Sequence, residues 1–225
     1  MEMRVEDQIQ PLITSSHTGR TGGETLDMSS KDGLTLRNKR KVFALRDHLA
    51  ALIPYGAQVL DVGCGDGALA YSILQSRPDV EVRGIDVLIW KETTIRIDQF
   101  DGQVIPYEDA SFDVVMLVNV LHHTEDPTVL LREAKRVTRK SILIKDHTRD
   151  GLFADTTLRF MDWVGNIGLG VPLPYEFWPR QRWIDTFDTL GLRITAWKND
   201  LRLYPRPVRW IFDRSLHFVA RLDLT

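Results

Sequence analysis

Cysteine is almost absent from this chain, because Cys64 is the only one among 225 residues. One cysteine cannot form an intramolecular disulfide, which excludes a disulfide-stabilised secreted scaffold and predicts a reducing compartment, the cytoplasm. A chain of this length needs no such cross-links, since an α/β domain of this size buries most of its unfolded surface.

Long apolar runs are also missing. No uninterrupted apolar stretch approaches the roughly 20 residues that span a bilayer, and residues 1–7 lack the apolar segment of a signal peptide. We therefore expect no stable membrane insertion.

The chain also lacks a strong net charge. It contains 29 Lys and Arg and 31 Asp and Glu residues, which gives a net charge of −2. This balance argues against a general nucleic-acid binder. The charge is nevertheless uneven, because the segment from Arg193 to Arg221 holds seven basic residues and only Asp200 and Asp213 as acids. That segment is either a solvated face or a surface for an anionic partner.

What the chain does contain is a glycine-rich stretch, VLDVGCGDGALA at residues 59–70. Its first four residues have the aliphatic character of a buried parallel strand. Gly63, Gly65 and Gly67 let the backbone turn sharply and approach a ligand closely. The residues that follow continue as an amphipathic helix, whose N-terminus offers free N–H groups. The stretch predicts a strand, a ligand-binding loop and a helix.

Two classes of cofactor bind such a loop. The pattern Gly63-x-Gly65-x-x-Ala68 is permissible for a dinucleotide, since alanine can replace the third glycine. A pyrophosphate would, however, lie close to the carboxylates of Asp61 and Asp66, and like charges repel at short range. The methionine end of S-adenosylmethionine (SAM) carries an ammonium group, which the same carboxylates attract. The acidic loop therefore favours SAM.

Residues 61–67 resemble motif I of the class I SAM-dependent methyltransferases, D/E-x-G-x-G-x-G. Similar segments follow in the family's order: RGID at 83–86, IPYEDASFDVV at 105–115, LHHTEDP at 121–127 and LREAKRV at 131–137. The resemblance covers about residues 57–147. It implies an α/β fold with a doubly wound, mostly parallel seven-stranded sheet and an antiparallel last strand. It also implies SAM as cofactor and a small-molecule acceptor.

The resemblance assigns cofactor contacts to the motif I residues Asp61, Gly63, Cys64, Gly65 and Gly67.

Four further residues are candidates for cofactor binding. Asp86 ends the next expected strand and would accept hydrogen bonds from both ribose hydroxyls. Val87 would pack on the adenine face or belong to the core. Asp101 stands where the family places an acid against the adenine amino group, or it forms an Asp-Gly turn. Asn119 lies near the carboxyl end of the expected central strand, where open α/β sheets bind ligands.

Two histidines are candidates for catalysis. His147, at the exit of the expected fifth strand, is the first candidate for a general base, and His122 is the second. Neither needs a large pKa shift to accept a proton near neutral pH. The alternative for His122 is a structural role in capping and orienting the loop, and the alternative for His147 is an ordinary polar strand exit. We expect no metal site, because adjacent His122 and His123 should point in different directions and no Cys/His set completes a ligand group.

The chain is expected to form one domain, residues 36–225, after a flexible segment or lid at 1–35 that is rich in Ser, Thr and Gly. Residues 151–190 form an aromatic, proline-rich insertion, interpreted as the roof of an acceptor pocket or as a satellite hydrophobic cluster. Beyond the glycine-rich stretch, the patterns predict helices at 36–54, 127–137 and 183–190, and strands at 80–85, within 87–97, and at 112–120, 141–144, 192–197 and 215–222.

Two other functions stay open at this point. An NAD(P)-binding oxidoreductase would use the same glycine loop, and a binding module could keep the fold without turnover. Residues 119–122 lack the Asn/Asp-Pro-Pro-aromatic pattern of enzymes that methylate planar amino groups, which disfavours that acceptor class. The sequence identifies neither the acceptor nor the oligomeric state, and methyl transfer needs no dedicated base where alignment suffices.

Overall fold

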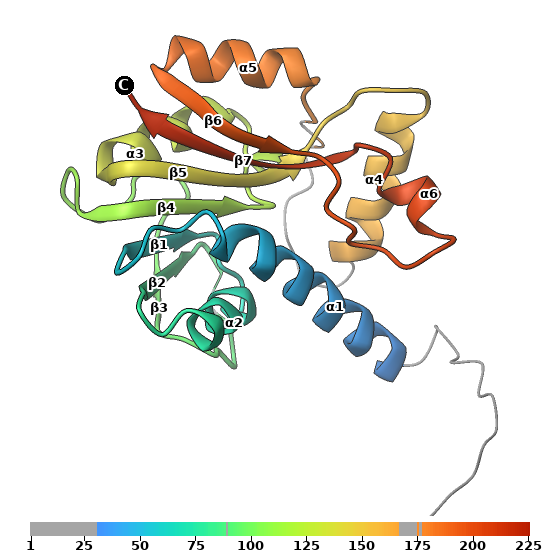
Figure 1. Cartoon of the computed structure of the whole chain (residues 1–225), viewed down its shortest axis with the longest axis horizontal. Helices are drawn as coiled ribbons and strands as arrows, with labels where there is room; N and C mark the ends of the chain where they lie inside the picture. Colours follow the sequence, from blue (N-terminus) through green and yellow to red (C-terminus); the bar gives the residue numbers. More distant parts are fainter. Residues whose placement is uncertain (1–30, 89, 167–174, 176) are drawn as a thin grey trace, which may run out of the picture.

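The structure, a computed structural model, describes residues 31–88, 90–166, 175 and 177–225 (Figure 1). The expected flexible segment lies outside the described residues up to position 30. Helix α1 begins at Lys31, five residues before the expected start. The elements are α1 (Lys31–Ala50), β1 (Gln58–Val62), α2 (Ala68–Ser76), β2 (Glu81–Asp86), β3 (Ile97–Gln99), β4 (Phe112–Val118), η1 (Leu121–His123), α3 (Pro127–Val137), β5 (Thr138–His147), α4 (Ala154–Asn166), α5 (Arg180–Thr189), β6 (Leu192–Lys198), α6 (Arg209–Phe212) and β7 (His217–Leu224).

The strands form one seven-stranded sheet in the order β3-β2-β1-β4-β5-β7-β6. Strands β1 to β5 pair in parallel, whereas β7 runs antiparallel to both β5 and β6. The predicted fold is thereby confirmed, including the antiparallel last strand. Strand β5 is longer than expected, because it begins immediately after α3 and continues through His147.

Helices cover both faces of the sheet, as the alternation along β4 shows. Val115 and Leu117 belong to the core formed with α3 and α5, while Val114 and Met116 belong to the core formed with α1 and α2. Successive side chains of a strand point to opposite faces. Since all four are fully buried, β4 is the central strand that the apolar run predicts.

The carboxyl ends of the parallel strands share one edge of the sheet. In Figure 1, helices α4 and α6 lie beyond this edge, on the right of the view, and the first half of α1 passes below them. Both α4 and α6 come from segments that follow β5 in the chain. Open α/β sheets bind ligands at this edge, so α4 and α6 flank the expected site.

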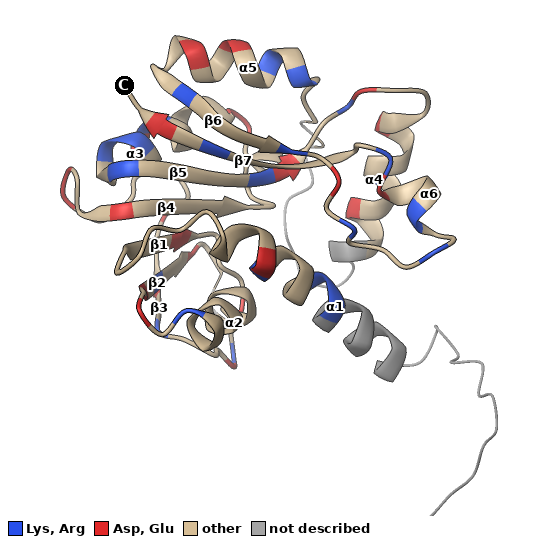
Figure 2. Cartoon of the chain, in the orientation of Figure 1, with Lys and Arg blue, Asp and Glu red and all other residues tan. Residues whose placement is uncertain are grey.

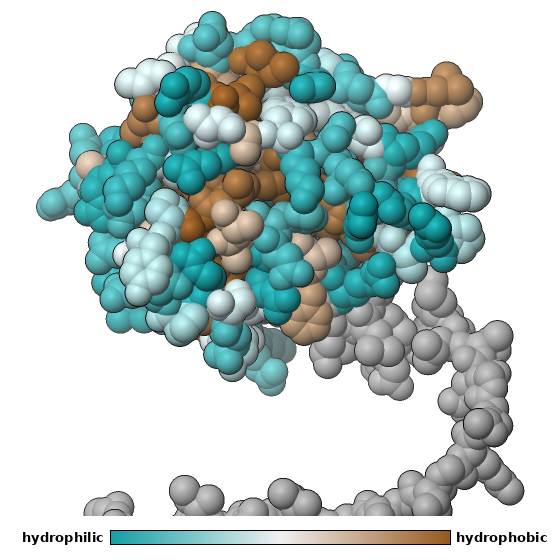
Figure 3. All heavy atoms as spheres, viewed as in Figure 1, coloured by the Kyte–Doolittle hydropathy of each residue, from teal (hydrophilic) through white to brown (hydrophobic). Residues whose placement is uncertain are grey.

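Basic residues of the C-terminal segment lie on β6, β7 and α6 and on the loops between them (Figure 2). Arg206, Arg209 and Arg214 line one pocket, together with Asp200 and Asp213. Arg209 forms ion pairs with Asp200 and Asp213, and Arg221 forms one with Asp223. These pairs favour the solvated face over an anionic partner's surface. Figure 3 shows a largely hydrophilic face with hydrophobic residues gathered between the polar ones. Among the described residues, none of the helices combines the length and the apolar character that crossing a bilayer requires.

Candidate functional site

The glycine loop joins β1 to α2 at the ligand-binding edge. The amide nitrogens of Gly63 and Cys64 donate to the carbonyl of Ile85 at 2.8 and 3.2 Å, which fixes the loop to β2. Gly63 has φ +70°, and a Cβ there would come within 2.5 Å of Val120 Cγ2. A Cβ on Gly65 would meet nothing closer than 3.9 Å. The loop is therefore closely packed at its start and open at its middle glycine, where a ligand can approach the backbone.

Asp61 lies in β1 directly before this loop and is 2 % exposed. Among the described residues, no group donates a hydrogen bond to its carboxylate. Burial, and after it the charge of Asp86, raise the pKa of Asp61 to about 7. A buried carboxylate without a donor is unfavourable by itself, and a bound cation would relieve that cost. The site fits the ammonium group of SAM on this ground.

Cys64 is a partly buried free thiol. Burial, with the nearby charges of Asp61 and Asp86, raises its pKa above the ordinary value, so the side chain stays protonated. Its Sγ atom lies 2.6 Å from where a Cβ on Gly84 would be. Cys64 thus packs the loop against β2 and has no thiolate for nucleophilic chemistry.

Asp86 and Val87 lie at the end of β2. The Asp86 carboxylate accepts hydrogen bonds from the amides of Gly65 at 2.7 Å and Leu88 at 2.8 Å, and the residue is buried. Val87 is 44 % exposed, and its Cγ1 lies 3.1 Å from where a Cβ on Gly102 would be. A partly exposed valine beside the 101–102 turn fits the adenine face better than the core alternative.

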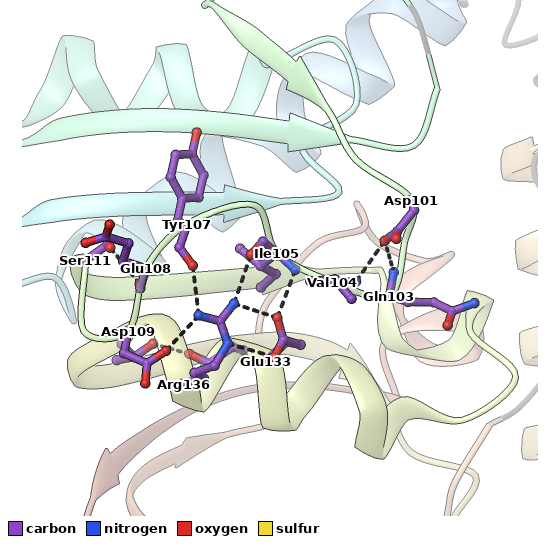
Figure 4. Close-up of polar contacts among 12 residues, drawn as sticks. Asp101, Gln103, Val104, Ile105, Tyr107, Glu108, Asp109, Ser111, Glu133 and Arg136 are labelled. Atoms are coloured by element: carbon purple, nitrogen blue, oxygen red, sulfur yellow. Dashed lines mark hydrogen bonds and ion pairs between the residues drawn. The ribbon is translucent and has the colours of Figure 1, made fainter.

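Asp101 forms the turn that the Asp-Gly pair predicts. Its Oδ1 accepts hydrogen bonds from the amides of Gln103 at 2.8 Å and Val104 at 2.7 Å (Figure 4). These two bonds lower the pKa of Asp101 below its usual value. One carboxylate oxygen is thus occupied by the loop, which leaves the other for a contact with adenine.

Arg136 and Glu133 of α3 fix the loop that carries this turn (Figure 4). The Arg136 guanidinium donates to the carbonyls of Ile105 and Tyr107 and forms ion pairs with Asp109 and Glu133. Glu133 in turn accepts from the amide of Ile105 at 3.0 Å. Residues 105–109 are therefore held by α3, directly after the turn at Asp101.

Asn119 follows β4 and has a backbone φ of +59°. Its backbone N–H donates a hydrogen bond to the carbonyl of Lys145 at 2.8 Å. Its Oδ1 accepts a hydrogen bond from Lys145 Nζ. Lys145 is buried in β5, and burial lowers its pKa to about 7. Asn119 lies at the predicted edge, and in this structure its side-chain oxygen binds the buried lysine.

A buried cluster of polar side chains, which we call the histidine cluster, occupies the edge beside β4 and β5. It consists of His122, His123, His147, His217, Asp146 and Asp162. Thus the structure brings the two catalytic candidates together, since the rings of His122 and His147 lie 4.6 Å apart.

His122 is held by Asp146. Its Nδ1 lies 2.7 Å from Asp146 Oδ1, and both side chains are almost fully buried. Burial lowers the pKa of His122, but the charge and hydrogen bond of Asp146, aided by Asp162, outweigh it and raise that pKa to about 9. His122 therefore carries a proton near neutral pH. A protonated ring has no free nitrogen to accept a proton, which disfavours His122 as a general base, and its place as second candidate stays a prediction.

His147 remains neutral. Its Nδ1 lies 3.2 Å from the same Asp146 Oδ1, and its ring lies 4.8 Å from that of His217. Burial, and after it the charge of Lys145, hold the pKa of His147 well below its usual value. A neutral imidazole has a free nitrogen that can accept a hydrogen bond. The lowered pKa makes His147 a weaker base than an unperturbed histidine, so its place as first candidate stays a prediction.

The aromatic insertion closes over the cluster. Phe177 stacks on His122 at 5.4 Å and packs with Ala154, Leu158 and Leu216 in a small hydrophobic core. Trp178 is buried against Trp183, 4.7 Å away, in the main core. Phe177 thus belongs to a small satellite cluster and Trp178 to the main core, while residues 167–174 and 176 lie outside the described part of the chain. The roof of an acceptor pocket stays a prediction.

The expectation that His122 and His123 point in different directions is wrong. In η1 their ring centroids lie 4.1 Å apart, and both rings face Asp162 of α4. Asp162 and His217 were missed as site residues. The only sequence signal for His217 is the antiparallel pairing of the last strands, which places it opposite His147.

Comparisons with known proteins agree with this geometry. The family described as "Methyltransferase domain" matches residues 19–199. The chain is 32 % identical over 132 residues to the 27-O-demethylrifamycin SV methyltransferase of Amycolatopsis mediterranei, covering 52 % of this chain but 48 % of that relative. It is 27 % identical over 186 residues to a ubiquinone biosynthesis O-methyltransferase of Xanthomonas axonopodis pv. citri, covering 70 % and 74 %. The chain thus spans about half the length of the first relative.

A solved structure shares the fold. The magnesium protoporphyrin IX methyltransferase of Synechocystis, with bound SAH, superposes with a TM-score of 0.57 at 13 % identity, covering 92 % of this chain and 90 % of that one. At this identity the likeness concerns the fold alone. The family match covers most of the chain, so a methyltransferase is a better assignment than an NAD(P)-binding oxidoreductase. The chain belongs to the class I SAM-dependent methyltransferases.

Proposed function

We propose that this protein transfers the methyl group of SAM to an oxygen atom of a small molecule. The observation that carries the proposal is the buried carboxylate of Asp61, which has no hydrogen-bond donor among the described residues and lies below an open glycine loop. The histidine cluster lies at the same edge of the sheet, two strands away on β5. A cation site and a proton-transfer site therefore flank one ligand position.

The cofactor would lie across the ends of β1 and β2. The SAM ammonium group would bind at Asp61, and the ribose hydroxyls at Asp86, whose carboxylate holds two loop amides in this structure. Adenine would lie against the exposed side of Val87, beside the turn at Asp101, which packs against Val87 at Gly102. Each assignment uses charge complementarity or a partly exposed apolar surface.

The reaction balances without a further reactant. The acceptor oxygen forms a bond to the methyl carbon as the carbon–sulfur bond breaks, and the electron pair of that bond passes to sulfur. The hydroxyl proton passes to neutral His147. Positioning alone can supply effective molarities of roughly 10⁵ M or more, so catalysis depends mainly on alignment. Protonated His122 beside Asp146 would orient the acceptor oxygen by donating a hydrogen bond.

Oxygen is the favoured acceptor atom for two reasons. The two curated relatives named above are O-methyltransferases by name. The histidine cluster also offers both a proton acceptor and a hydrogen-bond donor, which a hydroxyl group requires and a tertiary amine does not.

We also infer a cytoplasmic location and no nucleic-acid partner. The single cysteine is a free thiol, which fits a reducing compartment. The net charge of −2 and the ion pairs of Arg209 and Arg221 argue against a general nucleic-acid binder.

Isotope transfer tests the function. The protein is incubated with SAM labelled in its methyl group and with fractions of a small-molecule extract, and products are separated by chromatography and mass spectrometry. We expect a labelled product with stoichiometric S-adenosylhomocysteine, and at least tenfold less with Asp86→Ala at limiting SAM. SAM binding without any labelled product would instead support a binding module without turnover.

A further inference from the structure

The histidine cluster contains a geometry that the methyl-transfer chemistry does not require. His122 Nε2 lies 3.6 Å from Asp162 Oδ1, and His123 Nε2 lies 3.7 Å from the same oxygen. The three atoms all lie within 4.8 Å of one another. These separations exceed the roughly 2.7–3.2 Å of an N–H···O hydrogen bond.

The separations are close to those between ligands of one metal ion. Zinc binds histidine nitrogen and carboxylate oxygen at about 2.0–2.2 Å in tetrahedral geometry, which places any two ligand atoms about 3.3–3.6 Å apart. Both nitrogen–oxygen distances are within a few tenths of an ångström of this separation, and the two nitrogens lie within 4.8 Å of each other, so an inward movement of the histidine rings would complete the coordination. Two histidines and one carboxylate on one face are also a common set for divalent transition ions.

The environment of His122 supplies independent support. Its other nitrogen, Nδ1, lies 2.7 Å from Asp146 Oδ1, and that oxygen also accepts from the amide of His147 at 2.8 Å. A metal-binding histidine typically donates its second N–H to a buried carboxylate in this way, which orients the ring and leaves Nε2 for the ion. The second oxygen, Asp146 Oδ2, is buried without a hydrogen-bond partner among the described residues. Buried carboxylate charge of this kind favours a nearby cation.

We propose that His122, His123 and Asp162 bind one divalent transition-metal ion, with Asp146 as the carboxylate that orients His122. The ion would replace the Nε2 proton of His122 and would orient the acceptor oxygen in place of that proton. Three protein ligands leave a position open in tetrahedral coordination. This inference rests on the proposed function for its role, because the open position would bind the acceptor oxygen. A hydroxyl group on the ion loses its proton more readily, as metal-bound water does. The acceptor would then belong to the phenols, enols or other molecules whose oxygen can coordinate a metal.

The other candidate set, His122, Asp146 and His147, fits less well. The 2.7 Å between His122 Nδ1 and Asp146 Oδ1 is a hydrogen-bond distance, too short for two ligands of a tetrahedral ion. The geometry therefore assigns Asp146 to support and Asp162 to coordination.

Cobalt(II) is the probe, because it takes the place of zinc and reports coordination by its visible absorption. The full chain is treated with a chelator, dialysed and titrated with Co²⁺. We expect one equivalent to bind with the strong visible bands of a tetrahedral or five-coordinate site. Asp162→Asn and His123→Gln should lose this spectrum, and Asp146→Asn should weaken Co²⁺ binding by about 10–100-fold. Asp155→Asn, on the same helix but ion-paired to Arg159 at the surface, is the matched control and should bind Co²⁺ as the wild type does.

Calorimetric titration with SAM accompanies each variant and separates the two proposals. Because His123 is partly exposed, His123→Gln keeps the test available if Asp162→Asn does not fold. Stoichiometric Co²⁺ binding that depends on Asp162 or His123 supports the metal site even if no methyl transfer is found. No Co²⁺ spectrum, a spectrum unchanged in both variants, or full methyl transfer by chelated protein that binds SAM normally would overturn the metal site while leaving the methyltransferase proposal intact.

Discussion

Replacing Asp61 with Asn should stabilise the ligand-free protein and weaken its binding of SAM. The carboxylate is buried without a hydrogen-bond donor among the described residues, and its pKa is raised from 3.8 to about 7. Because the folded pKa exceeds the unfolded one, ionised Asp61 destabilises the fold. That cost is absent below pH 3.8, grows as the pH rises, and is complete above pH 7. The shift corresponds to up to about 4 kcal/mol at pH 8.

Urea denaturation at pH 8 and pH 4 measures this effect. Asp61→Asn should raise the free energy of unfolding by up to about 4 kcal/mol at pH 8 and change it little at pH 4. The matched control is Asp47→Asn, an exposed residue of α1 paired to Arg46, which should leave stability unchanged at both pH values. A variant that is no more stable than wild type at pH 8 would refute the reasoning.

The same residue predicts a pH dependence of SAM binding. A SAM ammonium group favours ionised Asp61, so binding below pH 7 must release the proton. Affinity in the wild type should fall up to tenfold for each pH unit below 7 and level off above it. Asp61→Asn should bind SAM about 10–150-fold more weakly at pH 8, the equivalent of about 1.5–3 kcal/mol, with no such slope. An identical slope in the variant would assign the effect to another group.

Three further predictions follow from the site and the core. Replacing His147 by Gln should lower turnover about 10²-fold or more if proton removal accompanies transfer, with SAM affinity intact in a calorimetric titration; unchanged turnover would point to catalysis by alignment alone. Trp178→Ala should lower the free energy of unfolding by about 3–5 kcal/mol, because Trp178 is buried. Trp163 of α4 is 54 % exposed, so Trp163→Ala should leave stability unchanged and raise only the KM for the acceptor. Equal losses of stability in the two variants would contradict this prediction. If residues 1–30 act as a lid, their amide hydrogen exchange should slow when SAM binds, and identical exchange in both states would make them a mere tail.

The sequence predicts those parts of the fold in which local pattern and ligand chemistry agree. Helix α3 begins at Pro127 and ends at Val137 as expected, since proline favours the first turn and basic residues favour the last. The glycine loop follows β1 and Asp86 ends β2, as expected, because their positions depend on consecutive residues of these two strands.

The histidine cluster could not be predicted in the same way. Asp162 reaches His122 only because α4 folds back over the sheet edge, a contact between residues 40 positions apart that no local period encodes. His217 meets His147 through the register of two antiparallel strands. The Lys145 contact with Asn119 depends on a left-handed backbone at Asn119, which is uncommon outside glycine. Tertiary contacts of this kind shift the pKa values of His122 and His147 in opposite directions, which the sequence alone could not predict.

The central claim is that the glycine loop at the edge of the sheet binds SAM, and isothermal titration calorimetry tests it most directly. The account predicts one equivalent of SAM per chain, no heat with NAD, and an affinity about 10–150-fold lower in a folded Asp86→Ala variant, which corresponds to about 1.5–3 kcal/mol for charge-assisted hydrogen bonds to the ribose. Absence of SAM binding in the wild type, or unchanged affinity in that variant, would contradict it.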